Sequence, residues 1–395
     1  MRILLVNAHG ADKSVGGAER YVFDLAAGLA LRGHETLVLS AFPVKTEPPG
    51  SETLVLHTKD WREDYFRRAQ NHVGDVLARP GRQLTRVLKK VRPDLVHTNN
   101  LPGISTAVWE VSRRLRIPVV HTLHDYQLLC PRVSLERGDG RACRPHPLLC
   151  GFRTRRLSRW APAVSEVIAG SEYLWRLHAR LFPTRSPHII RLPIAPISDR
   201  PLIRPGAPPR VIGYLGALER SKGIESLLDA VPRLADLGCT TQIAGGGRLR
   251  SLVEEATGQS LRYAGPLSGS AKLAFIEATD LGIVPSRWAE PSGPPYVVCE
   301  WLAAGRPVLA SVRGGLGEAQ VLPGVLPIEP SESSIVDAVR RLRDRATWEK
   351  VVERVPQVEN ENDFVRWLDA HEAVYRMAFG DRTTDTPTVI PDTGA

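Results

Sequence analysis

The sequence predicts an α/β protein in which two doubly wound parallel sheets face a common cleft. Strand-like and helix-like segments alternate through the first half of the 395 residues, a segment with six prolines follows at 192–209, and the alternation then starts again. Such alternation builds a parallel sheet with helices on both faces. Ligands of open α/β sheets bind at the carboxyl ends of the strands. We therefore expect a ligand site between the two halves.

The first half begins with an apolar run at 2–8, which is typical of a buried strand. A helix is expected over 18–31 because apolar residues recur there at helical spacing, and Gly33 ends it. The same reasoning predicts strands at 36–40, 93–100 and 117–125, and a helix at 105–115.

The second half follows the proline-rich segment, whose composition disfavours helix and sheet and indicates an interdomain linker. No residue-level period relates the two halves, so they are not a sequence repeat. Strands are expected at 210–218, 240–247, 261–267 and 281–286, with helices around 224–237, from 249 and around 271–278, and an amphipathic segment at 364–379. The predicted domains are 1–195 and 196–362, with a C-terminal helix at 363–380 and a disordered tail at 381–395.

The composition limits the classes of partner. A net charge of +9 favours anionic partners such as nucleotides, phosphates or acidic lipid. Nucleic acid is not expected, because the chain has neither zinc-finger spacing nor an aromatic RNA-binding signature. The sequence contains no run of about 18 apolar residues, so no membrane-spanning helix is expected. The start of the chain indicates a strand rather than a signal peptide. We therefore expect a cytoplasmic protein. The five cysteines are an odd number in a chain without an export signal, which argues against a disulfide framework.

Two glycines, Gly16 and Gly17, stand in the loop between the first strand and the first helix. Glycine allows backbone amides to approach a phosphate at a helix N-terminus, where the helix dipole also favours negative charge. A turn that needs glycine only for its geometry is the alternative. The loop does not read Gly-x-Gly-x-x-Gly, which argues against a nicotinamide dinucleotide.

The strand at 117–125 ends in His121, His124 and Asp125. A histidine at the carboxyl end of a strand faces the expected cleft, where it can hydrogen-bond a sugar or a phosphate. His124 and Asp125 at the tip are the functional candidates, whereas His121 is expected to be structural support. A satisfied buried histidine is the alternative for each ring.

A lysine in the second half, Lys222, stands at the start of a predicted helix with Arg220 close by. A lysine placed there is directed toward a diphosphate. The alternative is a solvated surface lysine, but the chain has only eight lysines. The further strand-end turns at Gly246 and at Gly265 and Pro266 face the same cleft, and their backbone groups suit the edge of a nucleobase.

Two glutamates flank a Gly/Pro cluster in the segment 289–311. Glu300 is expected to begin a helix that runs "CEWLAAG". A carboxylate buried on an apolar helix needs a hydrogen-bonding partner. Glu300 could accept hydrogen bonds from two ribose hydroxyls. Glu290 could bind a sugar hydroxyl, and the loop amides of Ser292 and Gly293 could bind a phosphate. A helix cap and a loop charge are the alternatives.

Taken together, these motifs resemble those of a retaining glycosyltransferase of the family 4 type, over nearly all of residues 1–379. The resemblance implies the GT-B fold, with two Rossmann-like domains facing a central cleft and a C-terminal helix that returns to the N-terminal domain. The N-terminal domain would bind the acceptor and the C-terminal domain the nucleotide sugar. The motifs are Gly16-Gly17-Ala18-Glu19, "HTLHD", "GALERSKG", "AGGG", "AGPL" and "EPSG…CEWLAAGRPV".

The resemblance also implies roles for single residues. Gly17 would approach the donor diphosphate or sugar, and His124 would touch the transferred sugar. Lys222 would hold the diphosphate, Glu290 would bind hydroxyls of the sugar, and Glu300 would bind the ribose. His124, Lys222 and Glu290 are therefore the catalytic candidates.

Two departures from the family pattern stand in the same motifs. Nine residues separate Glu290 from Glu300, where the family has seven, and the excess falls at 293–295, whose prolines lack an N–H for a phosphate. Ala217 occupies the position where the family usually has an arginine. Arg220 is the hypothetical substitute.

The reaction implied by the resemblance moves a sugar from a nucleotide-diphospho-sugar to an acceptor hydroxyl with retention of configuration. The chain has no Asp-x-Asp sequence, so no metal or other cofactor is expected. The acceptor classes left open are a cell-envelope glycan, a lipid-linked sugar and a small secondary metabolite. The alternatives are a sugar-nucleotide epimerase, a phosphorylase-like enzyme and an inactive nucleotide-sugar binder.

Two further segments stand apart from these motifs. Cys130, Cys143, His146 and Cys150 lie close in sequence, but a zinc site would want four ligands at closed spacing. An acceptor-side loop is expected there, with structural zinc as the alternative. The basic segment 82–92 is expected to be a solvated helix face, with peripheral contact to an anionic membrane as the alternative.

Overall fold

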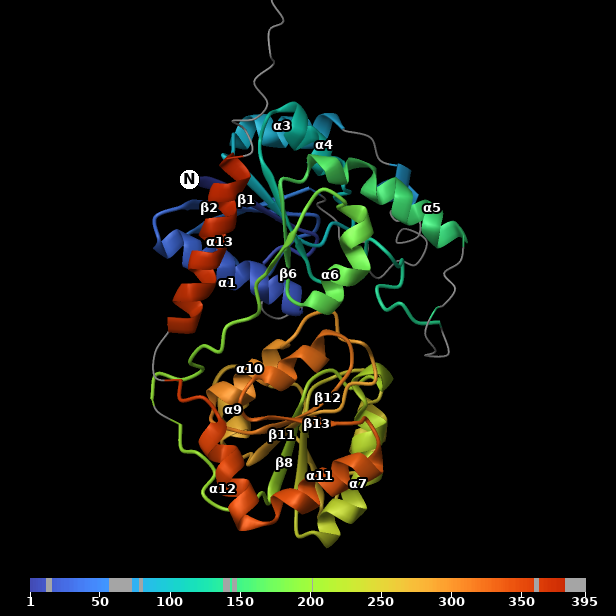
Figure 1. The fold of residues 1–395 in the computed structure, drawn as a ribbon, viewed down its shortest axis with the longest axis vertical. Coiled ribbons are helices and arrows are strands. Elements are labelled where there is room, and N and C mark those ends of the chain that lie inside the picture. The colour runs from blue at the N-terminus through green and yellow to red at the C-terminus, as the bar shows by residue number, and fades with distance from the viewer. Residues whose placement is uncertain are drawn as a thin grey trace, which may run out of the picture.

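The computed structural model describes residues 1–11, 16–56, 73–77, 81–137, 143, 148–200, 202–358 and 362–380. These residues form two halves stacked end to end, each built around one sheet with helices on both sides (Figure 1). The expected tail at 381–395 and His146 lie outside the described residues.

The N-terminal half contains a seven-stranded sheet in the order β3-β2-β1-β4-β5-β6-β7 with parallel pairing. Its central strands are buried on both faces and are therefore continuously apolar rather than alternating. The strands are β1 (Arg2–Asn7), β2 (Glu35–Ser40), β3 (Ser51–Val55), β4 (Leu95–Thr98), β5 (Val119–Leu123), β6 (Glu166–Ala169) and β7 (Pro187–Ile189).

The two faces of this sheet are covered by helices from distant parts of the chain. One core packs against α1 (Gly17–Leu31) and α13 (Asn362–Gly380). The other packs against α3 (Arg82–Val91), α4 (Ala107–Arg114) and α6 (Glu172–His178). The C-terminal helix therefore returns to the N-terminal half, as expected (Figure 1).

Helices α1 and α13 approach each other closely at Gly28. A Cβ atom there would lie 2.8 Å from a methyl carbon of Leu368, so a larger residue would push the helices apart. Ion pairs close the edge of this contact, because Arg32 binds Asp369 at 2.7 Å and Glu372 at 2.8 Å.

The C-terminal half contains a six-stranded parallel sheet in the order β10-β9-β8-β11-β12-β13. The two sheets with their helices confirm the predicted α/β fold of two doubly wound units. The strands are β8 (Val211–Leu215), β9 (Thr240–Ala244), β10 (Leu261–Tyr263), β11 (Leu281–Val284), β12 (Val308–Ser311) and β13 (Val325–Ile328). The helices are α7 (Ile224–Asp236), α8 (Arg250–Glu255), α9 (Gly269–Glu277), α10 (Tyr296–Ala303), α11 (Glu332–Leu342) and α12 (Arg345–Arg354).

The proline-rich segment between the halves packs against the C-terminal half. Ile194 is buried in the core that also contains α10. Buried Arg306 donates to the carbonyl oxygen of Ile203, and Arg204 donates to the carbonyl oxygen of Val355 at 2.7 Å. The proline-rich segment is thus held against the C-terminal half by packing and hydrogen bonds.

The carboxyl ends of the strands in both sheets point toward the junction of the halves. Strand β5 ends at Leu123 from above, and β8 and β11 end at Leu215 and Val284 from below. The loops that follow these strands meet there and form the site. None of the helices in the described ranges has the length and the apolar composition that a membrane crossing requires.

Candidate active site

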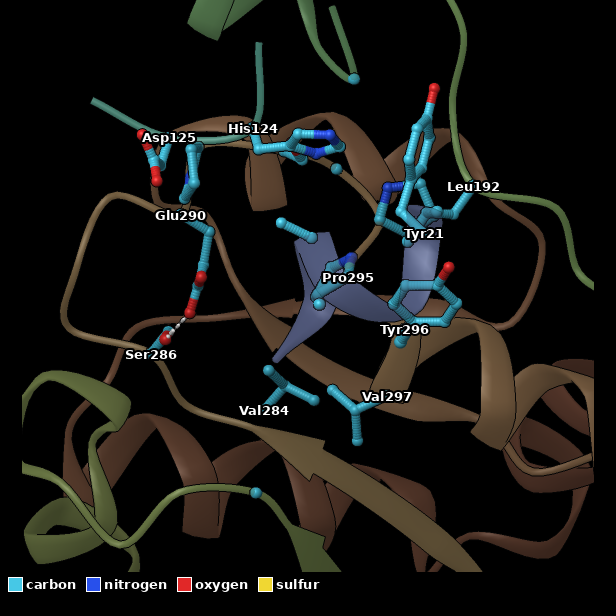
Figure 2. A pocket seen from close by; sticks show the side chains of 18 of the residues that line it. Tyr21, His124, Asp125, Leu192, Val284, Ser286, Glu290, Pro295, Tyr296 and Val297 are labelled. Atoms are coloured by element: carbon cyan, nitrogen blue, oxygen red, sulfur yellow. Dashed lines mark hydrogen bonds between the residues drawn. The ribbon is translucent and has the colours of Figure 1, made fainter. Parts of the chain in front are cut away.

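A cavity of about 520 Å³ lies between the two halves at these strand ends. His124 and Asp125 lie along one wall, and Val284 and Val297 along the opposite wall (Figure 2). Of the residues expected to form the site, Gly17, His124, Lys222, Glu290, Ser292 and Gly293 line this cavity.

Lys222 and Glu290 form an ion pair inside the cavity. The Nζ atom of Lys222 lies 2.6 Å from Oε1 of Glu290, and the hydroxyl of Ser286 donates to the same oxygen at 2.5 Å (Figure 2). Glu290 is only 6% exposed. A carboxylate buried to this degree needs donors, and Lys222 and Ser286 supply them. The pair places one cation and one carboxylate at the carboxyl end of the second sheet.

A short turn positions Lys222. It ends the 3-10 turn η3 (Arg220–Lys222), and Gly223 follows with a φ of +74°, a conformation that favours glycine. A Cβ on Gly223 would lie 1.8 Å from the carbonyl oxygen of Pro285, which belongs to the loop after β11. Glycine therefore allows the lysine turn to pack against the glutamate loop.

His124 enters the cavity from the N-terminal half. Its Nε2 atom lies 2.8 Å from Oδ1 of Asn99, and its ring meets the ring of Tyr21 edge-on with centroids 4.6 Å apart. Burial, together with the charge of nearby His371, lowers the pKa of His124 to about 3, so the ring is neutral at neutral pH. A neutral imidazole can accept or donate a hydrogen bond without carrying charge.

Asp125 is the next residue and also lines the cavity. Burial raises the pKa of its carboxyl group to about 6, and nearby Glu19 acts in the same direction. One carboxylate oxygen accepts the backbone N–H of Gln127 at 2.7 Å. The carboxyl group is therefore anchored at one oxygen.

The glycine loop before α1 reaches the cavity through Gly17, while Gly16 is the N-cap of the helix. A Cβ on Gly16 would lie 2.7 Å from the carboxylate of Glu19, which folds back toward the helix start. The first turn of α1 therefore has a carboxylate of its own beside it.

The loop after Glu290 is held tightly against neighbouring backbone. A Cβ on Gly293 would lie 1.9 Å from the carbonyl oxygen of Gly315. Helix α10 starts at Tyr296, directly after two prolines. The first amides that this helix presents at the cavity are consequently those of Tyr296 and Val297.

Glu300 lies in the second turn of α10 rather than at its start, and the cavity does not reach it. Arg20 of α1 donates to its Oε1 atom, and the Nζ atom of Lys272 lies 2.6 Å from the same oxygen. The Arg20 guanidinium also lies over the ring of Tyr296, 4.1 Å from its centroid. Glu300 thus joins the two halves through an ion pair.

Arg220 faces a separate groove outside the cavity. Its guanidinium lies 3.0 Å from Glu225 and its side chain is 73% exposed. Gly246, Gly265 and Pro266 are also absent from the cavity lining, and they form neighbouring turns at the ends of β9 and β10.

Several lining or supporting residues had not been expected from the sequence. Asn99 directly follows strand β4 in the segment "LVHTNN", so its position after a strand was the available signal. No sequence pattern indicated the other three residues, because their position in the site depends on how the two halves pack together. These residues are Tyr21, Ser286 and Trp288. The indole N–H of Trp288 donates to the carbonyl oxygen of Ser134 in the other half at 2.8 Å.

The cysteine-rich segment offers no metal centre within its described part. Cys130, Cys143 and Cys150 are free thiols, and no group of three or more metal-ligating side chains occurs among the described residues.

Family models match both halves of the chain. Residues 15–196 match the model described as Glycosyltransferase Family 4, and residues 209–345 match the one described as Glycosyl transferases group 1. A 42.6 kDa protein of the cps region of Klebsiella pneumoniae is 26% identical over 83% of this chain and 90% of its own length. Glycogen synthase of Mycobacterium tuberculosis H37Rv is 28% identical over 87% of this chain and 86% of its own length.

Solved structures share the fold. HepE of Anabaena, in complex with UDP and glucose, superimposes with a TM-score of 0.64 at 17% identity, covering 97% of this chain and 100% of its own. The catalytic domain of starch synthase IV of Arabidopsis thaliana, bound to ADP and acarbose, gives a TM-score of 0.65 at 12% identity, covering 96% and 99%. The two matched models, the relatives and the two-sheet architecture agree: the chain belongs to the family 4 glycosyltransferases of the GT-B fold.

Proposed function

We propose that this glycosyltransferase moves a sugar from a nucleotide-diphospho-sugar to an acceptor hydroxyl with retention of configuration. The observation that carries the proposal is the ion pair of Lys222 and Glu290 at the end of the second sheet, in the same cavity as His124 from the first. A cation for the diphosphate, a carboxylate for sugar hydroxyls and a neutral ring for another sugar atom are thereby gathered in one cavity.

The donor would lie mainly on the C-terminal half. Lys222 and the first amides of α10 would meet the diphosphate, with Ser292 and Gly293 beside it. The nucleobase would extend beyond the cavity to the neighbouring turns of Gly246, Gly265 and Pro266. Glu300 would bind the ribose once Arg20 or Lys272 makes room for the hydroxyls.

Arg220 would have to leave Glu225 to reach the diphosphate in place of the arginine missing at Ala217. Unchanged donor affinity in Arg220→Ala would exclude that role.

In the proposed reaction the bond between the anomeric carbon and the leaving phosphate oxygen breaks. The acceptor oxygen bonds to the same face of that carbon, and its proton passes to the departing phosphate oxygen. Negative charge develops on the diphosphate, where the ammonium group of Lys222 stabilises it. This scheme needs no metal, so activity should persist in EDTA, and a strict requirement for added Mg²⁺ or Mn²⁺ would contradict it.

The relatives suggest which donors to try first. One relative is named glycogen synthase, and the structures of HepE and starch synthase IV hold UDP and ADP. We propose a uridine or adenosine diphosphate sugar as donor. The acceptor classes are a cell-envelope glycan, a lipid-linked sugar and a small metabolite.

A thermal-shift screen of uridine, adenosine, guanosine and thymidine diphosphate sugars tests the proposal, because a bound donor raises the melting temperature. The stabilising donor is then incubated with acceptor pools, and product is detected by mass spectrometry. We expect turnover that depends on an acceptor hydroxyl. Isomerised donor without acceptor would indicate an epimerase, turnover that requires inorganic phosphate would indicate a phosphorylase-like enzyme, and stabilisation without turnover would indicate a binder.

Contact with an anionic membrane is a further proposal for the N-terminal half. The exposed face of α3 carries Arg82, Arg86, Lys89 and Lys90, and Leu148 and Phe152 of α5 (Leu148–Leu157) are 94% and 58% exposed. Co-flotation with phosphatidylglycerol vesicles, absent with phosphatidylcholine, is expected. Equal recovery without vesicles would mean that these are solvated faces.

A further inference from the structure

Asn99 lies at the carboxyl end of β4, next to the ring of His124. Its side chain is completely buried, and its Oδ1 atom lies 2.8 Å from Nε2 of His124. The amide group that faces a ring nitrogen decides whether that nitrogen carries a hydrogen: an amide oxygen requires N–H, and an amide NH₂ requires an unprotonated nitrogen.

The surroundings of Asn99 fix which way its amide points. Its Nδ2 group donates to the carbonyl oxygens of Val6 at 3.4 Å and His97 at 3.5 Å. An amide oxygen could not occupy that place, because it would face two other acceptors without a hydrogen between them. The oxygen of Asn99 therefore faces His124, and Nε2 of His124 must be the donor.

The rest of the ring is then determined. A neutral imidazole that carries its hydrogen on Nε2 has an unprotonated Nδ1, which accepts hydrogen bonds. No hydrogen-bond partner for this Nδ1 is found within the described part of the chain, and the ring lines the cavity. The ring of Tyr21 holds the imidazole edge-on, and the Tyr21 hydroxyl is itself fixed on Nε2 of His371 at 2.5 Å.

We propose that Asn99 is a positioning residue for sugar transfer, which holds His124 in its Nε2–H tautomer so that Nδ1 accepts a hydroxyl of the transferred sugar. The part that concerns the sugar depends on the proposed function, whereas the tautomer does not. The titratable groups around His124 are His97, His121, Tyr21, Asp125 and His371.

The tautomer is measured directly by nitrogen NMR on the full chain labelled with ¹⁵N-histidine, with His124→Gln used to assign the signals. We expect a protonated Nε2 and an unprotonated Nδ1 for His124 at neutral pH. In Asn99→Leu the ring loses its acceptor, so the Nδ1–H form should appear. In Asn99→Asp a carboxylate replaces the amide, so the pKa of His124 should rise and both ring nitrogens should be protonated as the pH falls.

Activity supplies the second measurement. With both nitrogens protonated, the ring can no longer accept the sugar hydroxyl. We expect kcat/KM of Asn99→Asp to fall by roughly tenfold below the new pKa and to recover above it, with a pH profile that the wild type lacks. A uniform loss at every pH, with melting temperature lowered in step, would instead mean that Asn99 only supports the fold.

The outcomes separate the two proposals. A wild-type His124 with its hydrogen on Nδ1 would overturn the role of Asn99, whatever the activity. Protonation of both ring nitrogens in Asn99→Asp with an unchanged kcat/KM would overturn it as well. The expected tautomer in a chain that turns over no nucleotide sugar would refute the proposed function and leave the tautomer assignment standing.

Discussion

At the scale of single residues, the site depends on how few charges the cavity contains. Lys222 is the only lysine or arginine among the described residues that line it, and it shares one oxygen of Glu290 with Ser286. A donor diphosphate would bring at least two negative charges into this space. In the proposed reaction the ammonium group would be the counter-charge for the leaving group, and the described lining holds no second lysine or arginine to replace it.

Replacing Lys222 by methionine keeps most of the side-chain volume and removes the charge. We expect kcat to fall by roughly 10²–10³-fold, the loss typical for one preorganised donor at a developing anion. Steady-state kinetics with the donor found in the thermal-shift screen measures this loss.

The matched control is Lys350→Met on α12, which removes the same charge from an exposed position far from the cavity. It should leave kcat unchanged. Comparable losses in both variants would mean that overall charge, and not Lys222 itself, controls the rate.

At the scale of helices and strands, the sequence was informative where patterns were long. The helix at 18–31 and the strands at 2–8 and 117–125 were expected, and they correspond to α1, β1 and β5. Five strands were not expected: β3, β6, β7, β12 and β13. β7 has three residues, and β13 contains Pro327, which a strand tolerates at the edge of a sheet.

The site was predictable to the same extent. Strand ends and helix starts indicated His124, Lys222 and Glu290, which all line the cavity, because such positions converge in any doubly wound sheet. The directions of Arg220 and Glu300 were not predictable from spacing. Their ion-pair partners Glu225, Arg20 and Lys272 are set by packing between elements.

Helix α13 supplies a prediction at this scale through His371. The Nδ1 atom of His371 lies 2.7 Å from the carbonyl oxygen of Trp367, and burial lowers the pKa of the ring from 6.5 to about 4. The folded protein therefore keeps this ring neutral while the unfolded chain takes up a proton below about pH 6.5. Stability is fully present above that pH and is lost as the pH falls toward 4, by roughly 3 kcal/mol for this one group.

Urea unfolding of His371→Gln at pH 7.5 and pH 4.5 measures this contribution. The variant should lose less stability than the wild type between the two pH values, even though it starts lower because the Tyr21 hydroxyl has lost its acceptor. Tyr375→Phe on the same helix keeps every histidine and should retain the wild-type slope. Equal slopes in wild type and His371→Gln would contradict the assignment. His121 and His178 act in the same direction, and Asp125, with its raised pKa, acts in the opposite one.

At the scale of the whole molecule, the two halves are joined by specific contacts around the cavity. The hydroxyl of Tyr126 donates to the carbonyl oxygen of Ala289 at 2.5 Å, and that of Ser171 donates to the carbonyl oxygen of Pro291 at 2.6 Å. The carboxylate of Glu318, in the C-terminal half, accepts the backbone N–H of Tyr173 at the start of α6 at 2.7 Å. These hydrogen bonds close the two halves against each other beside the cavity.

Glu318→Ala should loosen this closure. It removes the acceptor of the α6 amides and the partner of Arg191, which lies 3.0 Å away. We expect a larger radius of gyration in small-angle scattering and a severalfold higher ratio of donor hydrolysis to sugar transfer, because water enters an open site more easily.

Glu329→Ala is the comparison for this variant, since its partner Arg313 lies in the same half. It should change neither the radius of gyration nor the hydrolysis ratio. If Glu318→Ala behaves like Glu329→Ala, the contact at α6 does not hold the halves together.

The return of α13 to the first sheet has a consequence for biosynthesis. The ribosome releases the first seven strands early, but residues 362–380, whose Trp367, Leu368 and Tyr375 cover one face of that sheet, emerge only after the whole second half has been made. Until then an apolar surface is exposed to solvent, a situation in which nascent chains aggregate or bind chaperones. The half that is translated first is therefore the last to complete its core.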